Sequence, residues 1–142
     1  MRELYALSVL QPWAWLLFHR KDVENRSWPL PRWIVGKMVA IHASARFDRK
    51  EYESAHWLIQ ESCPSVVLPS PNDLAYGFII GTLRFVEDVT EHPSPFFFGP
   101  HGWLHADAHL LEAPIRCRGA LGFWRVPDEI TDAVRRQMEA TR

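Results

Sequence analysis

Residues 5–20 have the sequence YALSVLQPWAWLLFHR, and two patterns meet inside this stretch. Tyr5, Leu7 and Val9 alternate with smaller side chains, which predicts a short β-strand. Pro12 then stands where the first residue of a helix is expected, a position at which its missing N–H costs nothing. The apolar residues after it recur at helical spacing. A strand followed at once by a helix that ends near residue 20 is therefore predicted.

The rest of the chain continues with strands in irregular succession. Alternating patterns predict further strands over residues 23–28, 37–44, 77–89, 103–111 and 119–126. Helical patterns predict a helix after Asp48, which begins a capping-box-like signature, and a C-terminal helix at about 128–140 with Asp128 as its cap. Regular alternation of strand and helix is missing, so we predict an α+β fold, a small mixed β-barrel of five or six strands with peripheral helices. We expect a single domain over residues 1–142.

Composition places the chain among ordinary globular proteins. Of its 142 residues 47% are hydrophobic and 23% charged, which disfavours a largely disordered chain. No apolar run approaches the roughly 20 residues of a membrane span, and we expect no membrane partner. The two cysteines, Cys63 and Cys117, are too few for a disulfide framework. With no secretory pattern at the start, these features predict a cytoplasmic protein.

Charge and aromatic content narrow the classes of ligand. The formal net charge of −1 disfavours a broad, salt-driven grip on duplex nucleic acid. Residues 1–50 nevertheless carry nine Lys and Arg against four Asp and Glu, so an anion-attracting face is one interpretation and chance clustering is the other. The chain also has 7 Trp beside 8 Phe. Indole rings fill cores, but they also form stacking surfaces for flat ligands.

Four chemically active residue types lie close together in residues 21–28. If this segment is a strand, Glu24, Arg26 and Trp28 share one face, and Lys21 lies at the junction with the preceding helix. Two cations, a carboxylate and an indole then converge on one edge of the molecule. The alternative is a partly exposed ion pair beside a core tryptophan, which contributes at most about 1 kcal/mol.

The same stretch resembles the ASCH domain family of the PUA-like superfamily. That family's signature is Gly-x-Lys-x-x-Glu-x-Arg, and Lys21, Glu24 and Arg26 match it, whereas His19 stands at the glycine position. The Leu-Ser-Val-Leu-Gln-Pro-Trp-Ala segment before it is similar as well. Further similar motifs are Ile-His-Ala-Ser at 41–44, Gly-Pro-His-Gly-Trp at 99–103 and Gly-Ala-Leu-Gly-Phe-Trp at 119–124. The resemblance covers roughly residues 4–127.

The resemblance implies a β-barrel with a cleft between the barrel and the helix of the Gln-Pro-Trp segment. It implies that Lys21, Glu24 and Arg26 line this cleft, and that the ligand is RNA or a modified nucleoside or nucleotide. We expect no cofactor. Lys21 and Arg26 would contact phosphate or a base edge, and Glu24 would orient them. The full set of candidate ligand-binding residues is Gln11, Trp13, Lys21, Glu24, Arg26, Trp28, His42, Ser44 and Trp103.

Three alternatives stay open. Some relatives remove the acyl group from N4-acylcytidine with a Lys, a Thr and a Glu, which would make Lys21 and Glu24 catalytic; here Glu24 occupies the Thr position, and Ser27 and Ser44 are the nearest hydroxyl candidates. Other relatives are reported as metal-assisted ribonucleases.

The residues themselves raise the metal question too, because His105, Asp107 and His109 alternate along one predicted strand and offer ligands suited to zinc or manganese. The last alternative is a non-catalytic adaptor that binds a protein partner. In it, the Pro-Phe-Phe-Phe-Gly segment at 95–99 is either an exposed contact loop or, as we favour, a plug over one end of the barrel.

Overall fold

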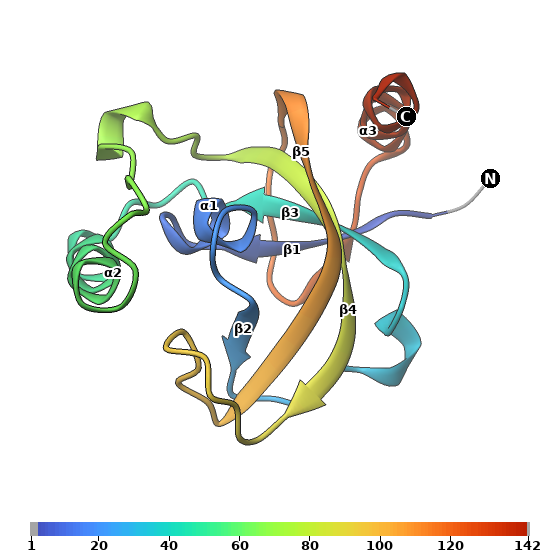
Figure 1. Cartoon of the computed structure of the whole chain (residues 1–142). Coiled ribbons are helices and arrows are strands. Elements are labelled where there is room, and N and C mark those ends of the chain that lie inside the picture. Colours follow the sequence, from blue (N-terminus) through green and yellow to red (C-terminus); the bar gives the residue numbers. More distant parts are fainter. Residues whose placement is uncertain (1–2, 142) are drawn as a thin grey trace.

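A computed structural model describes residues 3–141, which form one mixed sheet and three α-helices (Figure 1). The strands are β1 Tyr5–Val9, β2 Val23–Arg26, β3 Met38–Ala43, β4 Phe78–Val89, β5 His101–Arg116 and β6 Phe123–Arg125. The helices are α1 Trp13–Leu17, α2 Arg49–Ser62 and α3 Asp128–Ala140, with 3₁₀ turns at Arg32–Ile34 (η1) and Pro71–Asp73 (η2). The predicted bounds of β1 are confirmed. The predicted domain ends at residues 1, 2 and 142 lie outside the described residues.

The six strands lie in the order β2-β5-β4-β3-β1-β6. Only β1 and β3 run parallel to each other, with Tyr5 opposite Val39, and the other neighbours are antiparallel. The long strands β4 and β5 curl the sheet into a half-barrel (Figure 1). The α+β class is therefore confirmed, but the closed barrel is wrong: within residues 3–141 no ladder joins β2 to β6.

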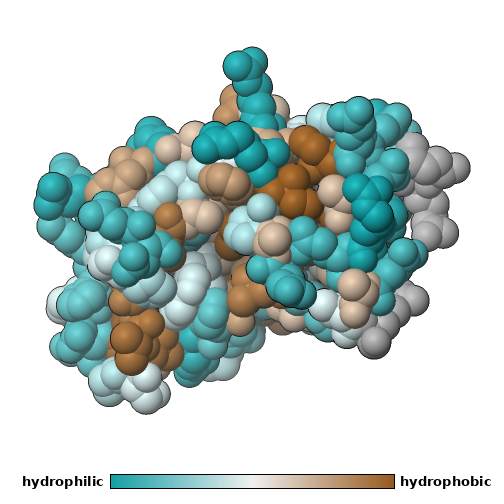
Figure 2. Space-filling view, turned by 90° about the horizontal axis from the view of Figure 1, so that it is seen from above, coloured by the Kyte–Doolittle hydropathy of each residue, from teal (hydrophilic) through white to brown (hydrophobic). Residues whose placement is uncertain are grey.

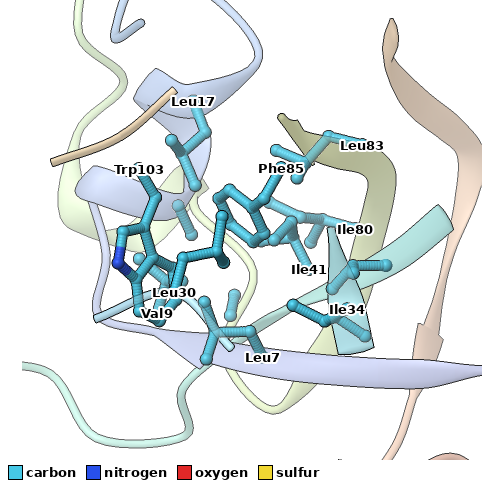
Figure 3. Close-up of a cluster of buried hydrophobic side chains, with 13 residues drawn as sticks. Leu7, Val9, Leu17, Leu30, Ile34, Ile41, Ile80, Leu83, Phe85 and Trp103 are labelled. Atoms are coloured by element: carbon cyan, nitrogen blue, oxygen red, sulfur yellow. The ribbon is translucent and has the colours of Figure 1, made fainter. Parts of the chain in front are cut away.

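The open side of the half-barrel is filled by non-strand segments. The two edge strands, β2 and β6, have only four and three residues, too few to bridge the gap. Ala14 and Leu17 of α1, together with Leu30 and Ile34 of the 27–37 connection, pack instead into the main core beside Trp103 (Figure 3). Burying these side chains supplies the apolar contact that strand closure would otherwise provide.

The two long helices lie on opposite sides of the sheet (Figure 1). On one side, α3 contributes Val134 to a cluster that includes Leu4 and Ile79. On the other, α2 contributes Ala55, Leu58 and Ile59 to a cluster that contains Leu16, Val23 and Phe96. As predicted, Asp48 caps α2: its Oδ1 accepts from the N–H groups of Lys50 and Glu51 at 3.0 and 3.2 Å.

The surface is mixed on the face seen from above in Figure 1. There, hydrophobic side chains form separate patches surrounded by hydrophilic ones (Figure 2). No helix within residues 3–141 is long and apolar enough to cross a membrane.

Several element ends differ from prediction. β5 runs over His101–Arg116 rather than 103–111, and β6 covers only Phe123–Arg125 of the predicted 119–126. The predicted bounds of α3, 128–140, are confirmed, but its cap differs. α1 stops at Leu17, because the chain turns back there and three consecutive N–H groups reach the carbonyl of Leu16. α3 has Pro127 at its cap position, and Asp128 lies inside the helix, where its Oδ1 accepts from Arg125 Nη2 at 2.8 Å. β2 ends at Arg26 rather than at Trp28, ahead of the prolines that follow.

The second half of β5 also departs from simple alternation. Residues 106–110 are all exposed, so the apolar face predicted over this segment is absent. Asp107 has a φ of 56°, and the register between β4 and β5 shifts between Thr82 and Arg84. Such a bulge inserts an extra residue and turns the following side chains to the other face.

Candidate functional site

A cavity of about 1080 Å³ lies between β2, α1 and α2. We call it the Lys21 cavity. Nearly all its lining side chains come from two segments, 8–28 and 44–58, and one more comes from the loop before β5. The residues used below are Ser8, Trp13, Lys21, Glu24, Asn25, Arg26, Ser27, Trp28, Ser44, Lys50, Glu51, Glu53, Trp57 and Phe98. Its volume slightly exceeds the range of about 300–1,000 Å³ that is usual for small-molecule sites.

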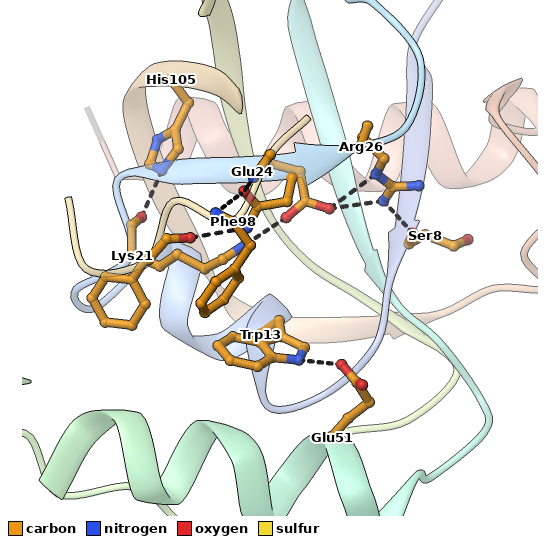
Figure 4. Close-up of polar contacts among 11 residues, drawn as sticks. Ser8, Trp13, Lys21, Glu24, Arg26, Glu51, Phe98 and His105 are labelled. Atoms are coloured by element: carbon orange, nitrogen blue, oxygen red, sulfur yellow. Dashed lines mark hydrogen bonds and ion pairs between the residues drawn. The ribbon is translucent and has the colours of Figure 1, made fainter. Parts of the chain in front are cut away.

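The turn after α1 delivers Lys21 into this cavity. The N–H groups of His19, Arg20 and Lys21 donate to Leu16 O at 3.0, 2.8 and 2.7 Å. On the far side, His105 Nε2 donates to the carbonyl oxygen of Lys21 at 2.8 Å. The backbone of Lys21 is thus held from both directions, and its side chain is directed inward (Figure 4).

His19 occupies this turn without the glycine of the ASCH signature. Its Nδ1 donates to Trp15 O at 2.7 Å, and its ring stacks on the Trp15 indole with centroids 3.7 Å apart. Within residues 3–141 the only non-glycine residue with a positive φ is Asp107. Position 19 therefore has no left-handed backbone that would need glycine.

A buried ion cluster forms the floor of the cavity. Lys21 Nζ lies 2.6 Å from Glu24 Oε1, while Arg26 Nε and Nη2 lie 3.0 and 2.9 Å from Glu24 Oε2 (Figure 4). Arg26 Nη2 also donates to the backbone carbonyl of Ser8 at 3.1 Å, which ties β2 to β1 across the open side of the half-barrel. The alternation predicted for residues 24 and 26 is thus what brings the two side chains together.

The cluster fixes the charge state of Glu24. Burial raises the pKa of this carboxyl, but the charges of Lys21 and Arg26 and their hydrogen bonds more than offset burial, so that the pKa is lowered overall. Glu24 is therefore ionised at neutral pH. Two cations share this single carboxylate, which leaves one unit of positive charge at the floor.

The two cations differ in their access to the cavity. The Lys21 side chain is 3% exposed and the Arg26 side chain 22%. Arg26 is therefore the cation that a ligand can touch, and Lys21 supports the cluster from behind. At the rim, Lys50, Glu51 and Glu53 add charges of both signs.

Aromatic rings form the walls. Trp13 Nε1 donates to Glu51 Oε1 at 2.8 Å, which sets the orientation of this indole, and Lys21 Nζ lies 5.7 Å from the ring centroid (Figure 4). Trp28 packs edge-on against Trp103 with centroids 4.8 Å apart. The rings of Trp13 and Trp28 are partly buried, so each has an inner side that packs on the core and an outer side toward the cavity.

The loop before β5 adds a further ring through Asn25. Asn25 Oδ1 accepts from the N–H groups of Phe98 and Gly99 at 2.7 and 3.0 Å, and its Nδ2 donates to Phe96 O at 2.9 Å. Phe96 is fully buried, whereas Phe98 is 61% exposed and lines the cavity. Thus one residue of the triple-Phe segment is a core residue and another lies at the candidate site.

Three of the predicted ligand-binding residues do not line the cavity. Gln11 is buried, donates from Nε2 to Ala75 O at 3.0 Å and accepts from Trp15 N at 2.9 Å. His42 is buried on the opposite face of β3, where Nε2 donates to Cys117 O at 2.6 Å and Nδ1 lies 3.0 Å from Ser8 Oγ. Trp103 is 0% exposed and belongs to the main core.

The other six, Trp13, Lys21, Glu24, Arg26, Trp28 and Ser44, do line the cavity. Alternation along β3 accounts for the failure at His42: it places His42 on the face of Met38 and Ala40, which packs away from the cavity, whereas Ser44 lies beyond the end of β3.

The three residues predicted as possible metal ligands, His105, Asp107 and His109, are not brought together. His105 is partly buried and bonded to the Lys21 carbonyl, while Asp107 and His109 are exposed beyond the bulge. Within residues 3–141 no group of three or more His, Cys, Asp or Glu is placed to hold a metal ion.

Sequence reasoning missed Asn25, Lys50, Glu51, Glu53, Trp57 and Phe98 as lining residues. A spacing signal existed for Glu53 and Trp57, which lie one helical turn apart and outside the apolar stripe of α2. Which helix face meets α1 depends on tertiary packing, and no local pattern encodes that. No family model and no curated protein matches this chain, so the site stands on its own geometry.

Proposed function

We propose that the Lys21 cavity binds a nucleoside or nucleotide, the ligand class implied by the resemblance to ASCH domains. The observation that carries this proposal is the juxtaposition of a fixed ion cluster at the floor with indole walls, Trp13 and Trp28. A nucleobase has a flat face for stacking and an edge of donors and acceptors for hydrogen bonding.

Each part of the cluster has a role in this proposal. Arg26 donates to a carbonyl or phosphate oxygen of the ligand, since it is the accessible cation. Glu24 is ionised, and a carboxylate has about four lone-pair sites, so it can accept from an exocyclic amine while it holds both cations. Lys21 is a positioning residue that keeps the carboxylate charged and in place. The single surplus positive charge favours a ligand with one anionic or strongly polar group.

Isothermal titration calorimetry with cytidine, N4-acetylcytidine and cytidine 5′-monophosphate tests the proposal. We expect saturable binding of at least one of these, and a loss of about 10- to 100-fold in affinity for Arg26→Gln, because a hydrogen bond to a charged group contributes about 1.5–3 kcal/mol. Arg136→Gln is the matched control, since Arg136 is exposed on α3, on the other side of the sheet. No heat of binding for all three ligands at millimolar concentration would rule the proposal out.

Amide hydrolysis is the second candidate, and the same samples test it. Ser27 and Ser44 both line the cavity. Within residues 3–141, however, no hydrogen bond joins either hydroxyl to a base that would activate it. Ser8 also lines the cavity and its Oγ lies 3.0 Å from His42 Nδ1, but His42 itself is buried and does not line the cavity. Release of cytidine from N4-acetylcytidine, abolished by Lys21→Ala, would establish hydrolysis. Binding without release would assign the cavity to recognition alone.

A further inference from the structure

A second cavity, of about 780 Å³, adjoins the first along α2. We call it the Tyr52 cavity. It is lined by Phe47, Arg49, Tyr52, Glu53, His56, Trp57, Gln60, Pro71, Asn72 and Tyr76. Glu53 and Trp57 line both cavities. These two residues are four apart on one helix, so they form a ridge, with the Lys21 cavity on one side and the Tyr52 cavity on the other.

The aromatic wall of the Tyr52 cavity is held in place before any ligand arrives. Tyr52 donates through its hydroxyl to Pro69 O at 2.7 Å, and Tyr76 donates to Pro71 O at 2.8 Å. Phe47 lies between the two rings, with both centroids at 6.1 Å. Rings fixed in this way lose little conformational entropy on binding, which favours affinity.

Trp57 is a large aromatic residue that is exposed and takes no part in the core. Its residue surface is 64% accessible, and it packs in none of the three core clusters. The Trp57 ring lines both cavities, so it is placed to contact a ligand that occupies either one.

From this arrangement we infer that the protein binds a single-stranded oligonucleotide across the ridge, with one nucleotide in the Lys21 cavity and its neighbour in the Tyr52 cavity. The inference rests on the proposed function and extends it from a single nucleoside to a strand. Neighbouring bases stack on successive aromatic rings in such proteins, and cationic side chains contact the backbone between them. Here the rings are those of Trp57 and of Phe47 with its neighbours Tyr52 and Tyr76. The cations are Arg49 and Lys50.

The charges at the ridge favour this occupant over two others. Arg49 opposes a quaternary ammonium ligand, which aromatic cages otherwise attract. A proline-rich peptide needs an aromatic groove but no cation. On α2 itself, Arg49 and Lys50 are balanced by Glu51 and Glu53. Over the lining of both cavities, however, four Lys and Arg residues (21, 26, 49 and 50) face three Glu residues (24, 51 and 53), and this surplus of one positive charge favours a phosphodiester.

Calorimetry with cytidine 5′-monophosphate, the cytidine dinucleotide and the cytidine trinucleotide tests the inference on the full chain. We expect the dinucleotide to bind about 5- to 100-fold more tightly than the mononucleotide, since each stacked base contributes about 1–3 kcal/mol. Phe47→Ala and Arg49→Gln should each reduce this gain to less than about threefold and leave mononucleotide affinity unchanged. Arg49→Gln keeps the test valid if Phe47→Ala disturbs the loop, and Arg136→Gln should keep the full gain.

The outcomes separate the two proposals. If the mononucleotide binds and the dinucleotide binds no more tightly, the second subsite is wrong and the proposed function stands. If no nucleotide of any length binds, the proposed function fails and this inference fails with it. If a proline-rich decapeptide binds more tightly than the dinucleotide, and Phe47→Ala abolishes its binding, the Tyr52 cavity is a peptide groove and the inference is overturned.

Discussion

The indole Nε1 of Trp13 donates a hydrogen bond to Glu51 Oε1 at 2.8 Å, and this contact joins α1 to α2 across the Lys21 cavity. Trp13 and Glu51 are 38 residues apart in sequence, so the hydrogen bond couples two helices that are remote in the chain. One helix carries a wall of the cavity and the other carries the ridge. The hydrogen bond therefore sets both the orientation of the wall and the separation of the helices.

Removing the acceptor should loosen this wall. For Glu51→Ala we expect the affinity for cytidine 5′-monophosphate to fall about 2- to 12-fold, since a freed side chain costs about 0.5–1.5 kcal/mol to order on binding. Glu51→Gln keeps an acceptor oxygen and should lose less than Glu51→Ala. Calorimetry on the two variants measures both values, and equal losses would show that charge rather than ring orientation matters.

Breaking the buried ion cluster should destabilise the fold. Lys21→Met leaves Glu24 buried with Arg26 as its remaining cation, and we expect the free energy of unfolding to fall by about 3 kcal/mol, the lower end of the range for a broken buried pair. Urea denaturation measures the change.

The double variant Lys21→Met, Glu24→Gln supplies the control. It removes the buried charge together with its partner and should recover part of the lost stability. It should not recover nucleotide binding, because the carboxylate that orients Arg26 is gone. A double variant less stable than Lys21→Met would contradict this account.

Stability should decline on acidification in two stages. Burial lowers the pKa of His42 and of His105 below the ordinary value of 6.5, so the unfolded chain takes up protons first and stability falls as the pH drops below that value. The pKa of Glu24 is lowered from 4.5, so its contribution is present above 4.5 and is lost as the pH falls further, through the folded pKa.

Urea midpoints measured from about pH 8 to pH 3 check both stages. His42→Gln and His105→Gln should each flatten the first stage and leave the second in place. A midpoint that stays constant between about pH 7 and pH 5 would contradict the first stage.

Gly102 should tolerate no side chain. A Cβ at this position would lie 2.7 Å from the ring of Phe97 and 2.7 Å from Val23 Cγ2, so Gly102→Ala must displace the loop or β2. We expect a loss of about 1–3 kcal/mol in stability, typical of overpacking. Ala108→Ser, at an exposed position of the same strand, should leave stability nearly unchanged. Thermal unfolding of the two variants gives the comparison.

Local sequence patterns predicted the strands and helices, but they did not predict that the sheet stays open as a half-barrel. Alternation located β1 and the pairing of Glu24 with Arg26, because both depend on the two-residue period of a strand. The open half-barrel followed instead from the shortness of β2 and β6 and from the packing of Leu30 and Ile34. Those contacts join segments remote in sequence, so no local pattern encodes them.

The candidate site was predicted best where its residues are neighbours in the chain. Lys21, Glu24 and Arg26 lie within six positions and form the predicted cluster. Trp103 shows the opposite case: its residue type suits stacking on a ligand, but its strand position turns it into the core behind Trp28. Residue type indicates which interactions a side chain can make, but its burial decides whether a ligand can reach it.

The lining of the Lys21 cavity divides the chain into two parts with different freedom to vary. Apart from Phe98, every residue that lines it lies between positions 8 and 58, while the long strands β4 and β5 and the helix α3 form the frame behind it. Substitutions on the exposed surface of α3 or in residues 106–110 therefore leave the candidate site untouched. A laboratory evolution experiment on the Lys21 cavity can accordingly confine its library to positions 8–58 and Phe98, and use the exposed surface of α3 and residues 106–110 for tags, fluorophores or immobilisation.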